Sequence, residues 1–382
     1  MIRMSTAMMV LFWASLLILV YVYFGYPSLT WFLARAFGRD PARSAILPSV
    51  SIVIPARNEE VLIEAKLRNT LALDYPAEQL EIVVASDAST DRTNELVKPF
   101  IARGVKLVVM PWHLGKSAMI SRVVPLLDGQ VIVFSDVSSE LEPTALRRLV
   151  ENFADPKVGC VCGLYRLKGP QDLRAEGEGL YWRYETWIKR QESRLHSILG
   201  AHGAFYAIRR SLFHRLRESA INDDYLIPMR IVEQGFRAVY EPDAVAWELE
   251  LASVEGEFAR RRRIAAGNCQ QIIELRGLLT LRHGWLAFSF LSHKVLRTLA
   301  PLFMITLGLS SPWLPWPWSL AMMSGQAVFY GSAFMGYLCY RRGRLVRGLS
   351  LPFYFCLGNL AMLMGVIKFL LSRRAPAWGR SR

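Results

Sequence analysis

The sequence predicts an α/β domain with a mainly parallel sheet, set between hydrophobic segments at both ends of the chain. Four short apolar runs rich in β-branched residues alternate with helical stretches, which is typical of a sheet covered on both faces. Of the 382 residues, 52% are apolar and only 20% are charged. This composition excludes the soluble, disordered, collagen-like and disulfide-scaffold classes of protein.

The apolar residues gather in three segments without any charged side chain, at 4–34, 298–340 and 348–367. A helix needs about 20 mainly apolar residues to cross a bilayer. We therefore expect four spans: residues 8–26, two within 298–340 that turn at Pro312, Pro315 and Pro317, and 349–371. The first segment is longer than the apolar part of a typical signal peptide, so we expect it to be retained as an anchor.

These segments divide the chain into an N-terminal membrane anchor at 1–43, a middle domain at 44–283 and a C-terminal membrane region at 284–382 of about three helices. Lysines and arginines flank the spans on the side of the middle domain, which places that domain in the cytoplasm. The arginines concerned are Arg35, Arg39, Arg43, Arg297, Arg341, Arg342, Arg344 and Arg347. The basic tail from Arg373 to Arg382 disagrees, because four spans would place it outside.

The net charge of +14 is explained by these juxtamembrane arginines, which favour anionic lipid headgroups. We find no pattern that favours nucleic acid. The five cysteines form no CxxC pair, as expected for a reducing cytosol. The histidines have no zinc-ligand spacing, so no zinc site is assigned.

The middle domain is predicted to begin with a regular alternation of strands and helices. The expected strands are 51–55, 81–85, 105–110 and 131–134. Three helices are expected between or after them: one that ends near residue 71, one at 91–103 and one that begins near residue 115. Short buried strands separated by helices indicate parallel crossover units.

Polar side chains directly follow three of these strands. Arg57 and Glu59 follow the first strand, Asp87 the second and Asp136 the fourth. Ligands of open α/β sheets lie beyond the carboxyl ends of the strands. Each residue alone could cap a helix, but two carboxylates at one edge repel unless a cation or a hydrogen-bonding ligand is present. A nucleotide diphosphate with Mg²⁺ or Mn²⁺ would provide a partner for both carboxylates. Neither a P-loop nor a dinucleotide fingerprint occurs.

Five segments in order resemble the family 2 glycosyltransferases, which are inverting nucleotide-sugar enzymes with a GT-A fold. The segments are 50–60, 81–92, 114–118, 133–138 and 221–225. The resemblance covers about residues 50–270, with membrane segments on both sides as in the polysaccharide synthases of this family. It implies a GT-A nucleotide-diphospho-sugar transferase domain and transmembrane helices at both ends.

The resemblance also implies roles for individual residues. Asp224 is implied to be the catalytic base, with Asp223 on the acceptor side, and Asp136 is implied to hold the metal. Apart from the resemblance, Gly203 lies in a run of small residues where an acceptor could approach the backbone, or where the chain simply turns. The implied donor-binding residues are Pro55, Arg57, Glu59, Asp87, Lys116, Asp136, Ser138, Arg260 and Arg263. Asp223 and Asp224 could also be acidic residues that cap a helix, and the run Arg260–Arg263 could be a basic helix on anionic lipid.

Two positions depart from the family pattern. Ser138 stands where these enzymes carry the second aspartate of D-x-D, which weakens the expected metal site. Ile264 stands where processive synthases carry a tryptophan that holds the growing chain. Processive synthesis and single-sugar addition therefore both stay open.

The sequence thus predicts a multi-pass enzyme of the cell inner membrane with a cytoplasmic catalytic domain. It would move a sugar from a UDP- or GDP-linked donor to a lipid-linked or glycan acceptor, using Mg²⁺ or Mn²⁺, in contact with membrane lipids and without nucleic acid. The alternative is a catalytically inactive membrane scaffold that keeps nucleotide-sugar binding.

Overall fold

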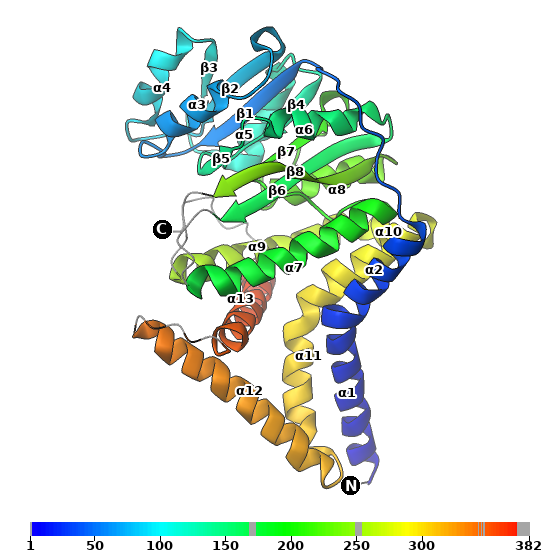
Figure 1. Cartoon of the computed structure of the whole chain (residues 1–382). Helices are drawn as coiled ribbons and strands as arrows, with labels where there is room; N and C mark the ends of the chain where they lie inside the picture. The colour runs from blue at the N-terminus through cyan, green and yellow to red at the C-terminus, as the bar shows by residue number, and fades with distance from the viewer. Residues whose placement is uncertain are drawn as a thin grey trace.

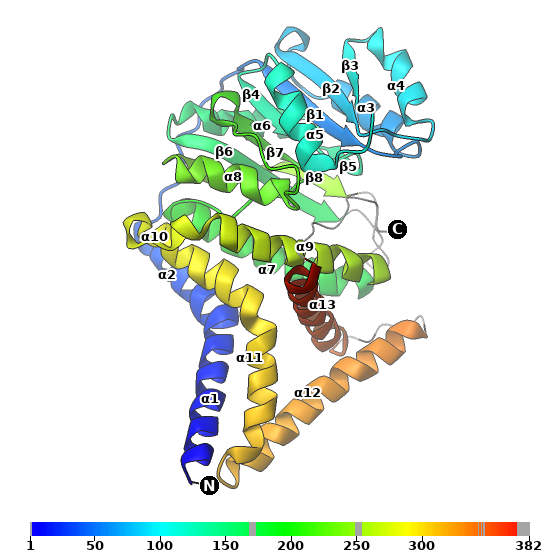
Figure 2. The same ribbon diagram turned by 180° about the vertical axis from the view of Figure 1, so that it is seen from behind.

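The computed structural model describes residues 2–167, 173–248, 254–342, 344, 346 and 348–372. It places an α/β domain above a group of long apolar helices (Figures 1 and 2). Two further helices, α7 (Leu173–Leu195) and α9 (Val254–Glu274), lie between the sheet and the apolar helices. The sheet domain and the apolar helices therefore meet across α7 and α9.

One mixed sheet with the strand order β3-β2-β1-β4-β7-β6-β8-β5 forms the centre of the domain. Its strands are β1 Val50–Ala56, β2 Leu80–Ser86, β3 Val105–Val109, β4 Val131–Phe134, β5 Ser139–Leu141, β6 Val158–Leu167, β7 Tyr206–Arg209 and β8 Arg237–Glu248. The first four strands pair in parallel. β7 runs antiparallel to both β4 and β6, and β5 runs antiparallel to β8. The carboxyl ends of β1, β2 and β4 consequently lie at one edge.

The four predicted strands are confirmed, and β4 has the predicted bounds. β1 is buried along its whole length, because helices cover both faces of the sheet. Alternate residues of the strand serve different cores: Val53 packs on one face, and Ile52 and Ile54 pack on the other. Each such side chain contributes about 1.5–3 kcal/mol of hydrophobic free energy.

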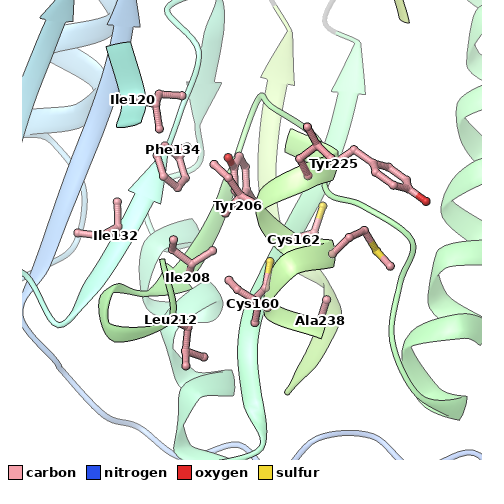
Figure 3. Close-up of a cluster of buried hydrophobic side chains, with 14 of the residues drawn as sticks. Ile120, Ile132, Phe134, Cys160, Cys162, Tyr206, Ile208, Leu212, Tyr225 and Ala238 are labelled. Carbon is pink, nitrogen blue, oxygen red and sulfur yellow. The ribbon is translucent and has the colours of Figure 1, made fainter. Parts of the chain in front are cut away.

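Two sets of helices cover the two faces of the sheet. α3 (Ile63–Leu71), α4 (Thr93–Ile101) and α6 (Ala145–Glu151) pack on one face. α5 (Lys116–Val123) and α8 (Asp223–Glu233) pack on the other. Figure 3 shows this second core, where the buried thiols of Cys160 and Cys162 lie among apolar side chains.

The expectation of four membrane spans needs a correction. Within the described residues, three helical stretches are long and apolar enough to cross a membrane: Thr6–Phe37, Trp285–Trp313 and Ser350–Leu371. They contain α1 (Ile2–Val20), α2 (Tyr26–Phe37), α10 (Trp285–Ser289), α11 (Arg297–Ser310) and α13 (Ser350–Ser372). The predicted hairpin exists as α11 and α12 (Trp318–Arg341), but α12 is not among the three.

The lower number of candidate spans bears on the side of the C-terminal tail. With three crossings, Arg341, Arg342 and Arg344 would lie between the second and third spans, on the side opposite to the middle domain, and would not support the predicted orientation. Arg347 and the arginines of the tail, at 373, 374, 380 and 382, lie outside the described residues. The orientation of the chain stays a prediction.

α13 packs closely against α9, and glycine permits the approach. A Cβ built on Gly365 would clash with Ala265 Cβ and would lie 2.5 Å from Arg262 O. On α12, a Cβ on Gly331 would meet no atom within 4 Å. Backbones approach this closely where small residues line a helix interface.

We expect Gly365→Ala to lower the melting temperature of the detergent-solubilised protein. Overpacking of a tight contact costs about 1–3 kcal/mol, whereas Gly331→Ala is expected to leave the temperature unchanged or to raise it slightly. Thermal unfolding of both variants, followed by intrinsic fluorescence, checks this. Equal melting temperatures would show that α9 and α13 do not pack as described.

Candidate active site

Most of the polar residues at the strand ends line one cavity of about 1240 Å³. The cavity lies at the carboxyl edge of the sheet and extends past α7 and α9. Eleven of the residues singled out by the sequence line it: Pro55, Arg57, Glu59, Lys116, Asp136, Ser138, Gly203, Asp223, Asp224, Arg260 and Arg263. Segments from residue 55 to residue 263 are therefore brought to one place.

Three carboxylates surround the ammonium group of Lys116 in this cavity. Lys116 Nζ donates a hydrogen bond of 2.7 Å to Asp136 Oδ1 and lies 3.8 Å from Asp223 Oδ2. Burial alone would lower the pKa of Lys116, but Asp136, Asp223 and Asp224 outweigh it and raise the pKa above its ordinary value. Lys116 therefore stays positively charged between Asp136 on one side and Asp223 and Asp224 on the other.

Gly203 lies at the centre of this group. A Cβ on Gly203 would lie 3.3 Å from both Asp136 Oδ2 and Lys116 Nζ and 3.4 Å from Asp224 Oδ2. Its backbone N–H donates to Asp224 Oδ2 at 3.2 Å. A side chain here would take the space between the acids, so glycine keeps that space for a reacting group.

Asp223 and Asp224 are the first two residues of α8, where a carboxylate is favoured by the helix dipole. The capping interpretation and the catalytic one are thus compatible. Asp223 is 4% exposed. Burial, with Asp224 and Asp136 nearby, raises the pKa of Asp223 to about 6 despite the attraction of Lys116.

The raised pKa of Asp223 predicts an acid limb in the pH profile of sugar transfer. Asp223 gains a proton as the pH falls through about 6 and then no longer attracts Lys116. We expect the rate to fall roughly fivefold from pH 6 to pH 5, since the ionised fraction falls by that factor. Nucleotide release measured from pH 5 to 8 checks this, with Asp223→Asn losing the limb. A flat wild-type profile would remove Asp223 from the mechanism.

Asp87 does not line the cavity, in contrast to the other predicted donor residues. Its side chain is fully buried and accepts hydrogen bonds from the backbone N–H groups of Leu114 and Gly115 at 2.7 and 2.9 Å. It also contacts His113 Nδ1 at 2.7 Å. Asp87 thereby fixes the segment that precedes Lys116, and its predicted contact with the donor stays untested.

Lys66 of α3 holds the segment around Asp136 through hydrogen bonds. Nothing in the sequence indicated this role. Its Nζ donates to Ser135 Oγ at 2.7 Å and to Ser139 O at 2.6 Å. Burial lowers the pKa of Lys66 to about 7, although Asp136 and Glu248 counteract it. A lysine inside a helix has no local signal of this role, since the contact depends on how α3 packs against the sheet.

The described residues contain no group of three or more His, Cys, Asp or Glu side chains that could by themselves hold a metal ion. Asp136 and Ser138 nevertheless both line the cavity with oxygen atoms. A hard divalent cation suits such ligands and takes several more from substrate phosphates and water. The donor set therefore fits a Mg²⁺ or Mn²⁺ ion that arrives with a diphosphate.

The basic run of α9 is divided between the cavity and another surface. Arg260, Arg261 and Arg263 line the cavity, and Arg262 does not. Glu257 bonds both Arg260 and Arg261, with Arg260 Nη2 at 2.6 Å. A helix turns about 100° per residue, so four consecutive side chains cannot share one face. The diphosphate interpretation and the lipid interpretation of the run therefore stay compatible, and both stay predictions.

His202 lines the cavity and is a second residue whose role had no signal in the sequence. Burial, with Lys189 nearby, lowers the pKa of His202 to about 3, so the imidazole is neutral. Its buried Nε2 has no hydrogen-bond partner among the described residues. The ring of Trp182 lies 5.1 Å away, edge to face. A neutral polar atom beside an aromatic ring is suited to a sugar hydroxyl and the apolar face of its ring.

Comparison with known proteins identifies the domain that carries most of these residues. Residues 51–217 match the sequence model of Glycosyl transferase family 2. The chain carries a family 2 glycosyltransferase domain. The matched residues contain β1 to β7, and with them Lys116, Asp136 and Gly203.

Several curated glycosyltransferases resemble the chain. A probable glycosyltransferase of Bacillus subtilis is 30% identical over 241 residues, which are 58% of this chain and 56% of that protein. A beta-monoglucosyldiacylglycerol synthase of Trichormus variabilis is 25% identical over 70% of this chain and 59% of its own length. A poly-beta-1,6-N-acetyl-D-glucosamine synthase of Staphylococcus aureus is 24% identical over 59% and 56%. The chain thus spans little more than half the length of these relatives.

A solved structure supports the fold of nearly the whole chain. A mannosyltransferase from Pyrobaculum calidifontis, in complex with GDP-Man and Mn²⁺, aligns over 94% of this chain and 99% of its own with a TM-score of 0.72. The two sequences are 22% identical. The predicted GT-A-like α/β fold with a mainly parallel sheet is confirmed.

Proposed function

We propose that this glycosyltransferase is an inverting enzyme that moves a sugar from a nucleotide-sugar donor to a lipid-linked or polysaccharide acceptor at the cytoplasmic face of the membrane. The observation that carries the proposal is the group of Asp136, Lys116 and Asp224 around Gly203 in one cavity. This group offers a cation site for a diphosphate and a separate carboxylate for a proton.

The donor side is formed by the ends of β1 and β4 and by α9. Arg57 and Glu59 line the cavity after β1, and Arg260 and Arg263 face it from α9. Guanidinium groups bind diphosphate through several N–H donors at once. When bound, a divalent ion at Asp136 and Ser138 would neutralise the charge on the leaving nucleotide. Lys116 adds a fixed positive charge beside it.

The acceptor side is formed by the start of α8. Asp224 would accept the proton of an acceptor hydroxyl while the hydroxyl oxygen bonds to the anomeric carbon. The bond from that carbon to the phosphate oxygen breaks at the same time, and the nucleotide diphosphate leaves with the electron pair. Direct displacement places the new bond opposite the old one and inverts the anomeric configuration.

A donor panel with the purified protein tests the proposal. We expect nucleotide release from one UDP- or GDP-linked sugar in detergent with Mn²⁺. The structural neighbour with GDP-Man and Mn²⁺ makes GDP-linked sugars a first choice. The absence of turnover with every donor, together with intact nucleotide binding, would instead favour the inactive scaffold that Ser138 and Ile264 bring into consideration.

A further inference from the structure

The cavity of the acids continues into the helices that are apolar enough to cross a membrane. Arg297 and Thr298 line it from the start of α11. α13 contributes Leu351, Tyr354, Phe355, Gly358, Asn359 and Met362. These positions follow one another by three or four residues, or directly, so they form one face of α13. The volume of about 1240 Å³ exceeds the roughly 300–1,000 Å³ of a typical small-molecule site.

Lys294 lies between the acids and this face of α13. It belongs to the π-helical turn Phe290–Leu296 within the candidate span Trp285–Trp313, and it lines the cavity. Its Nζ donates to Asn268 Oδ1 at 2.7 Å and lies 3.6 Å from the centre of the Tyr225 ring. Tyr225 directly follows Asp224, so the ammonium group and the proposed base belong to neighbouring parts of the cavity.

Lys294 makes no direct ion pair among the described side chains, because no carboxylate lies within 4 Å of its Nζ, and Asp224 and Glu185 act on its charge only from farther away. A neutral amide and an aromatic face are its partners. A charged group in a membrane-spanning segment is costly unless it is paired, and such residues mark ligand sites. An anionic group of a ligand in the cavity would supply a direct ion pair for Lys294.

We propose that the acceptor is a lipid phosphate that enters from the membrane along α13. Its hydroxyl would lie at Asp224, its phosphate at Lys294, and its hydrocarbon on the face that contains Leu351, Phe355 and Met362. The order of the lining from acidic to basic to apolar matches the order of groups along such a lipid. This inference rests on the proposed function, since it names the acceptor class of the same site.

The test is photo-crosslinking of the full chain in detergent with a diazirine-bearing long-chain alkyl phosphate, compared with the corresponding uncharged alcohol. We expect labelling of peptides of α13. We also expect the phosphate to be preferred by about tenfold, because a charge-assisted hydrogen bond from Lys294 strengthens binding by about that factor. Lys294→Met is expected to abolish the preference, and Lys294→Arg to keep it. Lys368→Met, at a lysine of α13 outside the cavity lining, is the matched control.

A second pair of variants tests the groove. Met362→Trp fills the lining and is expected to reduce labelling by both probes several-fold, whereas Met364→Trp, outside the lining, should behave as wild type. Equal labelling of the wild type by phosphate and alcohol would overturn the phosphate assignment. Full labelling of Met362→Trp, with its melting temperature unchanged, would overturn the route along α13.

Donor turnover in the same samples separates this inference from the proposed function. Release of nucleotide to water needs no acceptor, so it is measured in the wild type and in Met364→Trp, which lies outside the lining and should keep it. If the probes label as expected while no donor is turned over, the lipid site stands and the proposed activity fails. If a donor is turned over but the phosphate is not preferred, the activity stands and the lipid phosphate is excluded.

Discussion

Asp224→Asn is expected to lower the rate of sugar transfer by about 10³-fold, because a positioned general base contributes roughly 10²–10⁴-fold. The amide keeps the size of the carboxylate but cannot take a proton. The hydrogen bond from Gly203 N to Asp224 Oδ2 can be kept by the amide oxygen. Nucleotide binding and the melting temperature should therefore stay close to wild type.

The matched control for this loss is Asp243→Asn, at an exposed aspartate of β8 outside the cavity lining. It should transfer sugar at the wild-type rate. Asp223→Asn provides a second comparison, because Asp223 contacts Lys116 and is the more buried acid. If Asp224→Asn keeps transfer and Asp223→Asn loses it, the base has been assigned to the wrong member of the pair.

Asp136→Ala is expected to weaken Mn²⁺-dependent binding of the nucleoside diphosphate by about 10²–10³-fold. A metal ion contributes several kcal/mol through its charge on phosphoryl oxygens, and Asp136 is the carboxylate placed to hold it. Titration calorimetry with and without Mn²⁺ measures the effect. Binding without metal should change little, since Arg260 and Arg263 stay in place.

Ser138→Asp is the reciprocal change, because it adds a second carboxylate beside Asp136 at the cavity wall. We expect tighter Mn²⁺ binding by about tenfold, as one more charged oxygen ligand provides. Metal dependence that is the same in wild type, Asp136→Ala and Ser138→Asp would place the cation elsewhere.

The strands and the polar residues at their carboxyl ends could be predicted because the sequence patterns that indicate them are local. A strand such as Ile52 to Ile54 is apolar at consecutive positions, since both of its faces are buried. The residues that follow β1 and β4 must then lie at one edge, so Arg57, Glu59 and Asp136 could be grouped before the structure was known. Parallel pairing alone brings these ends together.

The contacts made by packing could not be predicted in this way. β6 pairs with β7 and β8, which are far from it in sequence. Lys66 and Asp87 support the site through contacts 69 and 27 residues away, with Ser135 and Leu114. The sequence also did not show that α13, from the far end of the chain, lines the same cavity as Asp224. Periodicity marks α13 as apolar and does not indicate which face meets the domain.

The anomeric configuration of the product tests the central claim most directly. The claim is that Asp224 activates an acceptor hydroxyl opposite a diphosphate held at Asp136, in a single displacement within one cavity. The product formed from an α-linked nucleotide sugar and a membrane lipid extract is examined by NMR for its one-bond coupling between C1 and H1, which differs between the two anomers. The account predicts a β-linked sugar, and an α-linked sugar would contradict it.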